Sequence, residues 1–541
     1  MTVARSVADV LSEHVTLEVE CIDRMYLNVY QPRLQHVNGV VWFFRGHRQA
    51  TFASSALMDP MTKNFVAGIH RFARTAAVPV VDFAKGQRKD DLALEHLAEF
   101  AAAGGTEGVL FVGRAQEKTP LFRTEKRRNP DTGASYPWIV RSTGVVNQFY
   151  FYCVDADFGP FFFKFCSYFP YNAKLCINGH EWAKRQAAKA GIEFEALDNG
   201  FASCADPKAL NRICARLSPA KIDALARKWL AILPHPFERA DRTAGYRYDL
   251  SILQAEFSLT QVLDRPLSGR VLFEETIREN LDIGRPDKVG LVFDRRIVRR
   301  GPSATPGRFR TRVLTTGVTP SLHVDYKHSK IKQYHKEGRA LRTETTINDS
   351  RDFAIGKRLC NLPALAAVGF SANRRLLDVE RLACDPTIGH DAFRAVADPV
   401  VAGAQRVAAL PFDNARTQAL LSALVVFRLL PHGFRNADLR AHLAPLLGLD
   451  PSAMTPGRMS YDLRRLRLHG LIERVEGTHR YTVTNRGLTL ALFLTRVHNR
   501  LIRTGLADLL DPDALPSALR RDLERFTKNI DALAIELDLA A

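Results

Sequence analysis

Four acidic residues of the chain could hold a metal ion and so support chemistry on a phosphodiester. Asp155 and Asp157 follow an aromatic, strand-like run, Asp198 ends a later apolar run, and Glu344 lies within a stretch of β character. Carboxylates are ligands that Mg²⁺ and Mn²⁺ prefer, and such ions activate attack on phosphorus. The alternative is that Asp-x-Asp before a Gly-Pro pair is ordinary turn chemistry, in which case no cofactor is needed.

The elements around the three aspartates follow a recognisable order. Residues 149–177 are unusually aromatic and predict three strands, residues 180–190 predict a helix, and residues 192–197 predict a further strand. This order resembles the beginning of an RNase H-like core, in which carboxylates at strand ends hold metal ions. The resemblance implies a nuclease or transposase in which Asp155 and Asp157 bind Mg²⁺ or Mn²⁺ together with the later aspartate.

A second candidate centre lies on a predicted β-hairpin of residues 330–336 and 340–348. Strand alternation places Tyr334 between two lysines on one face, and Arg342 beside Glu344 on the partner strand. The arrangement is similar to a stretch of the rolling-circle replication initiators of phages and small plasmids, which use a tyrosine nucleophile beside a metal. It implies a tyrosine nicking protein, although the His-hydrophobic-His motif of that family is missing. The competing interpretation is an ion pair between Glu344 and Arg342 or a nearby lysine.

Two apolar segments are assigned by their spacing. Residues 248–263 predict a core-forming helix that Pro266 should end, from the spacing of Leu250, Leu253, Phe257, Leu259, Val262 and Leu263. Residues 39–44 predict a short buried strand, because they form a brief continuous apolar run.

The C-terminal part has the clearest helix boundaries. Residues 418–430 predict one helix, a second begins at Asn436, and a third runs from a Thr455 cap to a stop at Gly470. Two short β runs then predict a hairpin, and helical spacing returns after it.

Three helices, a basic third helix, a hairpin and a closing helix resemble a winged helix-turn-helix domain. In that family the third helix enters the DNA major groove, and the hairpin, or wing, touches phosphate or the minor groove. Carried over by position, the base-facing residues would be Ser460, Tyr461, Arg464 and Arg467, and the backbone-facing residues would be Arg474, His479 and Arg480. The alternative is a winged helix that contacts protein, with its arginines in solvent.

The charge of the chain favours a polyanionic partner. Lys and Arg number 76 against 58 Asp and Glu, a formal charge of +18. Much of the excess lies in residues 294–342, where we expect Arg295, Arg296, Arg299 and Arg300 to grip a phosphate backbone. DNA is the expected partner, and RNA is the alternative because the aromatic strands could stack bases.

These features predict an α+β or α/β multidomain protein with mixed sheets. The expected regions are α/β at 1–140, α+β at 141–400, the winged helix at 401–505 and a helical tail at 506–541 that could form a homodimer. The eight cysteines form no CxxC pair, and no transmembrane run or signal peptide is evident, so we expect a cytoplasmic protein without membrane contact. The leading hypothesis is a DNA-binding protein, as in a mobile element or plasmid, and the alternative is the metal-dependent or tyrosine-dependent enzyme.

Overall fold

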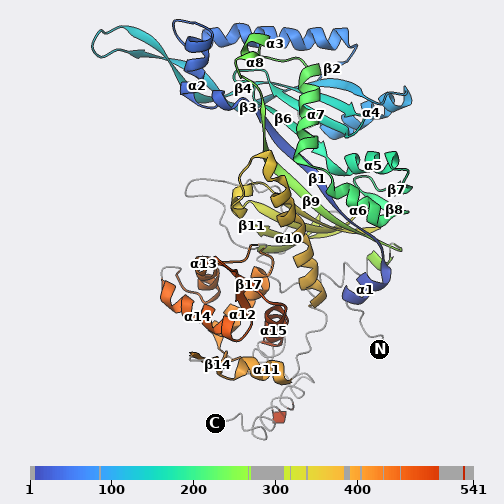
Figure 1. The fold of residues 1–541 in the computed structure, drawn as a ribbon, viewed down its shortest axis with the longest axis vertical. Helices are drawn as coiled ribbons and strands as arrows, with labels where there is room; N and C mark the ends of the chain where they lie inside the picture. Colours follow the sequence, from blue (N-terminus) through green and yellow to red (C-terminus); the bar gives the residue numbers. More distant parts are fainter. Residues whose placement is uncertain are drawn as a thin grey trace, which may run out of the picture.

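The computed structural model describes residues 7–498 apart from 85–86, 266, 270–309, 317–318, 337–338, 383–389, 403–404, 413, 431 and 451–452, and in the tail residues 525 and 528–529. This part of the chain forms one large sheet with helices packed on it, followed by a group of C-terminal helices at one end of the molecule (Figure 1). The expected α+β class with a mixed sheet is confirmed. Within the described ranges, no helix combines the length and the apolar composition needed to cross a membrane.

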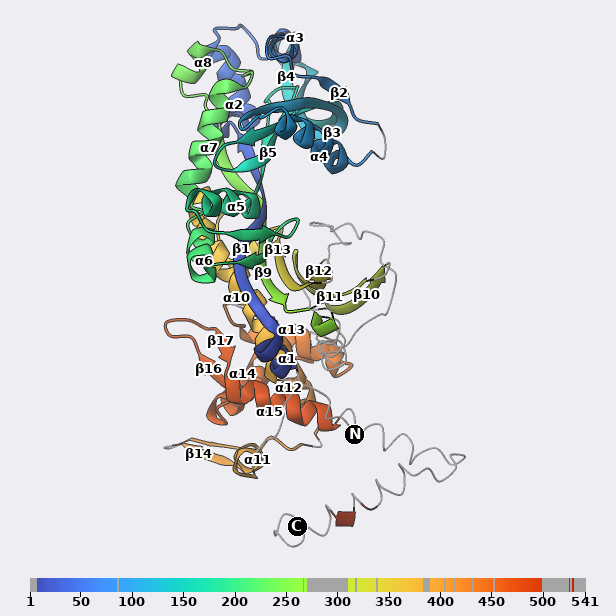
Figure 2. The same ribbon diagram turned by 90° about the vertical axis from the view of Figure 1, so that its right-hand side faces the viewer.

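An eleven-stranded sheet is the frame of the molecule. Neighbouring strands are antiparallel, except for the parallel pair β2 and β3. In sheet order the strands are β10 (Arg310–Thr316), β11 (Thr319–Tyr326), β12 (Ser329–Lys336), β13 (Ala340–Ile347), β9 (Asp249–Leu263), β1 (Val15–Tyr30), β6 (Ala173–Asn178), β5 (Gly159–Cys166), β4 (Ser135–Asp155), β3 (Gly108–Arg128) and β2 (Val80–Asp82). The sheet therefore joins the N-terminal and central regions of the sequence in one layer. In Figure 2 its two ends, around β3 and around β10, project to the same side of β1.

Helices and short hairpins cover this sheet. Phe151, Phe163 and Phe165 of β4 and β5 are fully buried in its core, so the aromatic run serves packing. The covering elements are α1 (Val7–His14), α2 (Val37–Trp42), α3 (Ser55–Thr75), α4 (Lys89–Ala102), α5 (Gly179–Lys189), β7 (Phe194–Ala196), β8 (Phe201–Cys204), α6 (Pro207–Ala215), α7 (Pro219–Ile232) and α8 (Arg239–Thr243), with the short turns η1 (Pro32–Leu34), η2 (Phe43–His47), η3 (Ser350–Phe353) and η4 (Leu359–Asn361).

Strand β9 corrects the helix expected over residues 248–263. Glu256 and Ser258 alternate with Ala255 and Phe257, a period of two that a strand requires. β1 pairs with one edge of β9 and β13 with the other, so both edges are hydrogen-bonded. The helix-like spacing of the leucines was therefore overridden by pairing with strands that are remote in sequence.

Residues 39–44 depart from expectation in the opposite direction. They lie in α2 and the π-helical turn η2 and not in a strand. Phe43 and Phe44 are buried against the ring of Phe169. Periodicity alone does not separate a short buried strand from a short buried helix, which explains the error.

The helix α10 (Leu362–Leu382) belongs to two hydrophobic cores. Its first half packs into the core of the sheet and its second half into the core of the C-terminal helices, through Leu362, Leu365 and Val368 and through Ala372, Leu376 and Val379 respectively. Val324 of β11 and Ile331 of β12 also enter the second core. The C-terminal helices are therefore packed on the sheet and on α10.

The C-terminal elements begin with α11 (His390–Ala397), β14 (Val400–Ala402) and β15 (Gln405–Val407), which were not expected from the sequence. The later elements have the expected order of three helices, a hairpin and a helix: α12 (Ala415–Phe427), α13 (Asn436–Leu446), α14 (Pro456–Leu468), β16 (Ile472–Arg474), β17 (Tyr481–Val483) and α15 (Asn485–Val497). The hydroxyl of Thr455 accepts a hydrogen bond from the backbone N–H of Arg458, and Gly470 takes a φ of +72° after α14. Both local signals therefore act as expected.

Candidate functional site

Asp155 is a structural residue at the end of β4. Its carboxylate accepts hydrogen bonds from Nζ of Lys228 at 2.7 Å, from Nε1 of Trp229 at 2.9 Å, and from the backbone N–H groups of Asp157 and Phe158. Burial alone would raise the pKa of Asp155, but these hydrogen bonds hold it below its usual value. The carboxylate thus ties the turn after β4 to α7, and its lone pairs are already in use.

Asp157 and Asp198 are both exposed, and their carboxylates have different partners. Asp157 pairs with Lys189 of α5, and Asp198 pairs with Lys336 of β12. β7, which precedes Asp198, pairs with β8 in a separate hairpin, so the strand that would continue an RNase H-like core does not join the main sheet. Among the described residues, the three expected aspartates do not form a common metal-binding group.

A different set of carboxylates does converge. Asp23 of β1, Glu256 of β9 and Glu344 of β13 each offer an oxygen, and these oxygens all lie within 4.8 Å of one another. We call these three residues the acidic cluster. Of the expected catalytic residues, Glu344 is the one that the structure places in it.

Sheet pairing explains why these residues meet. β9 lies between β1 and β13, so the three carboxylates come from three successive strands. In β1 the register shifts between Ile22 and Met25, and Asp23 lies in this irregularity opposite Glu256. Glu344 is paired with Ser258, two residues from Glu256 on the same face of β9.

Arg342 lies beside the acidic cluster and is fully buried. Its Nη2 donates to Oδ2 of Asp23 at 2.5 Å, its Nη1 donates to the carbonyl oxygen of Asn199, and its Nε is 3.7 Å from Oε2 of Glu344. Asp23 also accepts a hydrogen bond from the side chain of Asn199. The interpretation of Glu344 as an ion-pair partner is thus met in part, but the strong partner of Arg342 is Asp23.

His180 completes the buried side of this arrangement. Its Nε2 is 2.9 Å from both Nη2 of Arg342 and Oγ of Ser258, and because Nη2 can only donate, Nε2 of the neutral ring accepts from Arg342. Burial, followed by the charge of Arg342, lowers the pKa of His180 to about 3. Asn178 caps α5, and Gly179 lets the helix approach β1, because a Cβ there would lie 2.1 Å from the carbonyl oxygen of Ile22.

The electrostatics of the acidic cluster are uneven. Burial, then the charges of Glu344 and Asp23, raise the pKa of Glu256 to about 7. Burial and Asp23 also raise the pKa of Glu344. Burial would raise the pKa of Asp23 too, but the Arg342 guanidinium holds it below its usual value. The cluster therefore holds more negative charge than its neighbours compensate.

Tyr334 and Lys332 of β12 border the cluster. The hydroxyl of Tyr334 donates to Oε2 of Glu344 at 3.4 Å, and Lys332 is paired in register with Glu344. The ammonium of Lys332 lies over the ring of Tyr334, 4.3 Å from its centroid. Burial raises the pKa of the Tyr334 hydroxyl and lowers the pKa of Lys332. The expected grouping of Tyr334, Arg342 and Glu344 is therefore present.

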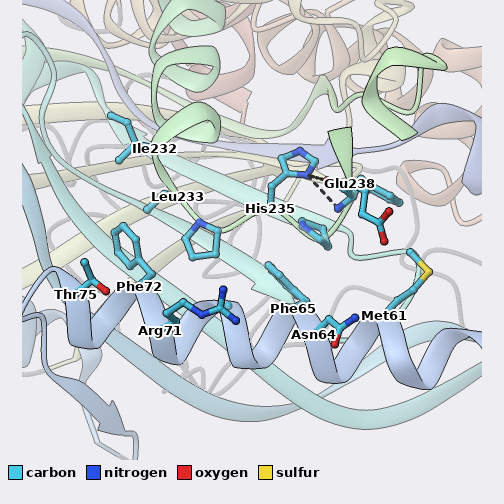
Figure 3. Close-up of a pocket in the computed structure, with 14 residues that line it drawn as sticks. Met61, Asn64, Phe65, Arg71, Phe72, Thr75, Ile232, Leu233, His235 and Glu238 are labelled. Atoms are coloured by element: carbon cyan, nitrogen blue, oxygen red, sulfur yellow. Dashed lines mark hydrogen bonds between the residues drawn. The ribbon is translucent and has the colours of Figure 1, made fainter. Parts of the chain in front are cut away.

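Two pockets lie outside the cluster. One, of about 480 Å³, is lined by Glu117, Lys164 and Lys174, and in it Lys164 is ion-paired with Glu117. Burial, followed by the charge of Lys164, lowers the pKa of Lys174. The other, of about 450 Å³, lies between α3 and the segment after α7 (Figure 3). There His235 accepts a hydrogen bond from the backbone N–H of Phe237, and Glu238 is the one carboxylate among the lining residues. Neither pocket gathers a set of catalytic groups.

The expected base-facing residues of α14 form an exposed surface. Ser460, Tyr461, Arg464 and Arg467 are all exposed, and we call them the α14 face. The guanidinium of Arg464 lies 5.5 Å from the centroid of the Tyr461 ring. Within the described chain the side chains of Arg464 and Arg467 have no hydrogen bond and no ion pair. Ser460 accepts a hydrogen bond from the side chain of Asn436.

The opposite side of α14 is fixed to the protein. Asp462 is buried and accepts hydrogen bonds from Nε and Nη2 of Arg416 at 3.0 and 2.5 Å. Arg465 donates to the backbone carbonyl oxygens of Ala408 and Ala409 before α12. His469 is within hydrogen-bond distance of the same Ala408 oxygen and of the carbonyl oxygen of Ala395. These contacts determine which residues of α14 face solvent.

The three expected wing residues differ in their surroundings. Arg474 and His479 are exposed, and Nε of Arg474 donates to the carbonyl oxygen of Thr478 within the turn. Arg480 is half-buried and donates to the carbonyl oxygen of Gly433 at 3.1 Å. Arg480 therefore holds the hairpin to the chain before α13, and two side chains of the wing remain for a ligand.

Some predicted features lie outside the described residues. These are Arg295, Arg296, Arg299 and Arg300, and nearly all of the tail expected to form a homodimer. Their roles stay predictions.

Two members of the acidic cluster, Asp23 and Glu256, were missed at the level of sequence. Glu256 was missed because β9 was assigned as a helix, and the signal that could have found it is the alternation of residues 254–260. Asp23 interrupts the alternation of β1, which is a signal for a bulge and not for a ligand.

Comparison of the chain with protein-family models, curated proteins and solved structures found no match.

Proposed function

We propose that the protein binds double-stranded DNA through the α14 face. The observation that carries this proposal is the division of charge on α14. Arg464 and Arg467 face solvent without partners in the described chain, whereas Asp462, the only carboxylate of the helix, is buried against Arg416. An exposed helix face with arginines and no carboxylate suits phosphate oxygens and the acceptors of guanine in the major groove.

The surrounding elements support the same proposal. The helices α12, α13 and α14 are followed by the hairpin of β16 and β17, and a bridge between Phe434 and Tyr481 adds the chain between α12 and α13 to that hairpin. This is the order that the resemblance to a winged helix implies. Arg474 and His479 would reach the DNA backbone from the wing, while α14 enters the groove.

A winged helix used for protein contacts is the alternative. The buried centre of a protein interface is more apolar than the rest of the surface, although Tyr and Arg are themselves enriched there. On the α14 face, the aromatic ring of Tyr461 is covered by a guanidinium, and the remaining members are polar or charged. That composition favours a nucleic-acid partner over a protein partner.

The test compares the charge-reversed variant R464E/R467E with R212E/R216E. Arg212 on α6 and Arg216, which caps the C-terminus of that helix, are both exposed, so the control makes the same change of charge away from α14. A duplex selected by the wild-type protein from a random-sequence pool is titrated at several salt concentrations. R464E/R467E should lose binding, because each bidentate base contact contributes about 1–3 kcal/mol. The control should lose only the small part of the binding affinity that comes from the net charge of the protein.

Equal affinity of R464E/R467E and wild type, with both proteins folded by circular dichroism, would contradict the proposal. So would an equal loss in the two variants, because net charge alone would then account for binding.

A further inference from the structure

In the described part of the chain, the acidic cluster has one directly paired cation for its three carboxylates. Arg342 is the one cation within 4.0 Å of its oxygens among the described residues, against three carboxylates. Lys332 lies over the Tyr334 ring and makes no such contact, and Glu256 accepts its hydrogen bond from the neutral side chain of Gln254. Carboxylates that share a site in this way repel each other unless a further cation is present.

A buried hydroxyl beside the cluster is left without a partner. Thr346 is 2% exposed, and its Oγ1 has no hydrogen bond in the part of the chain that the structure describes. Thr346 is directly paired with Glu256 and is two residues from Glu344 on β13, so its side chain is on the face of the cluster. Buried polar groups are normally satisfied, so this hydroxyl indicates a missing ligand atom.

We infer that Asp23, Glu256 and Glu344 form a binding site for a divalent cation. The donors are all oxygen atoms, which selects a hard cation such as Mg²⁺ or Mn²⁺. The oxygen separations, within 4.8 Å, need only small side-chain shifts to reach the spacing of ligands around such an ion. A water molecule on the ion would give Thr346 its partner.

The surroundings also indicate what else the cation would bind. Three carboxylates leave coordination positions open on an octahedral ion. Lys332 is paired in register with Glu344, and Lys330 is paired with Thr346, so both lysines are on the face of the cluster. An anionic ligand with phosphate oxygens would meet the cation and these ammonium groups together.

This site differs from the one expected from sequence, and it is independent of DNA binding by the α14 face. Asp155, Asp157 and Asp198 are replaced as ligands by Asp23 and Glu256, with Glu344 retained. The experiment that tests it therefore uses the full-length protein with Mn²⁺ alone and contains no nucleic acid.

Binding of Mn²⁺ is measured by the loss of the free-ion paramagnetic resonance signal, with Mg²⁺ as competitor. The variants are E256Q and E344Q, which keep the size of the side chain, and D157N is the matched control because Asp157 pairs with Lys189 away from the cluster. Wild type and D157N should bind Mn²⁺ alike. E256Q and E344Q should each bind at least about tenfold more weakly.

Circular dichroism and the melting temperature in EDTA establish that each variant is folded. If E344Q is unfolded, the result with E256Q decides, since Glu256 has no ion pair to lose in the described chain. Absence of Mn²⁺ binding by the wild type at millimolar concentration would overturn the inference. Equal affinities of E256Q, D157N and wild type would also overturn it.

Discussion

Arg342 and the arginines of the α14 face have the same side chain in opposite surroundings. Arg342 is fully buried, bonded to Asp23 and held beside His180. Arg464 and Arg467 are exposed and have no charged partner in the described chain. A buried arginine with carboxylates fixes structure, whereas exposed arginines without carboxylates leave their charge available to a ligand. Residue type alone therefore does not identify a binding surface, and the partners of each arginine do.

The largest effect is expected on stability, from replacing the buried Arg342. R342M removes the guanidinium and leaves Asp23 buried without its charged partner, so unfolding should become easier by about 3–5 kcal/mol. R467M, at the exposed position, should change the free energy of unfolding by no more than about 0.5 kcal/mol. Denaturant titration followed by circular dichroism measures both. Similar losses in the two variants would show that burial of Arg342 does not matter to stability.

A smaller effect on the buried member of the comparison is expected from acid, through His180 beside Arg342. The pKa of His180 is lowered to about 3, so the unfolded chain takes up the proton first, near the ordinary histidine pKa of 6.5. The stability that His180 contributes is therefore present above pH 6.5 and is lost as the pH falls from there towards 3. Between pH 7 and pH 5 this group should cost about 2 kcal/mol.

Other groups titrate in the same range, so a variant must isolate His180. Glu256 acts in the opposite sense, because its raised pKa favours the folded protein as the pH falls. His235, whose pKa is lowered to about 4 by burial, acts in the same sense as His180. The difference in unfolding free energy between wild type and H180N, measured from pH 7 to pH 5, gives the contribution of His180. If this difference is the same at pH 7 and pH 5, the predicted loss of stability through His180 is wrong.

The smallest effect is expected on DNA binding, from replacing Tyr461 beside the exposed Arg464. Y461A removes the ring over which Arg464 lies, and should weaken DNA binding by about 0.5–1 kcal/mol. The free energy of unfolding should stay nearly constant because Tyr461 is 42% exposed. Y461F keeps the ring and should bind as wild type does. Equal affinity of Y461A and Y461F would show that the ring does not position Arg464.

The sequence was most informative where structure is determined locally. The limits of α14 follow from Thr455, Pro456 and Gly470, residues that act on the backbone next to them. The hairpin of β12 and β13 was predicted for the same reason, since its strands are adjacent in the chain. Its two faces then follow from alternation, which is how Tyr334 and Glu344 could be named in advance.

The acidic cluster could not be predicted in this way. Asp23 and Arg342 are 319 positions apart in sequence. They meet because their strands, β1 and β13, are the two neighbours of β9 in the sheet. Asp155 and Asp157 looked more suitable as metal ligands than Asp23 and Glu256, because they are close together in sequence and follow a predicted strand. Their partners, Lys228 and Lys189, come from helices whose placement the sequence does not specify. Convergence of carboxylates is a property of strand order, which a single sequence leaves open.

The helix α10 sets a spacing within the molecule. It has 21 residues, so it is about 30 Å long, and its two halves lie in two different cores. Because both halves of α10 are packed in this way, the helix fixes the distance between the sheet and the C-terminal helices. A polymer that touched both the α14 face and the acidic cluster would have to match a separation that the protein keeps constant. Its minimum length would then be a measurable constant of this fold.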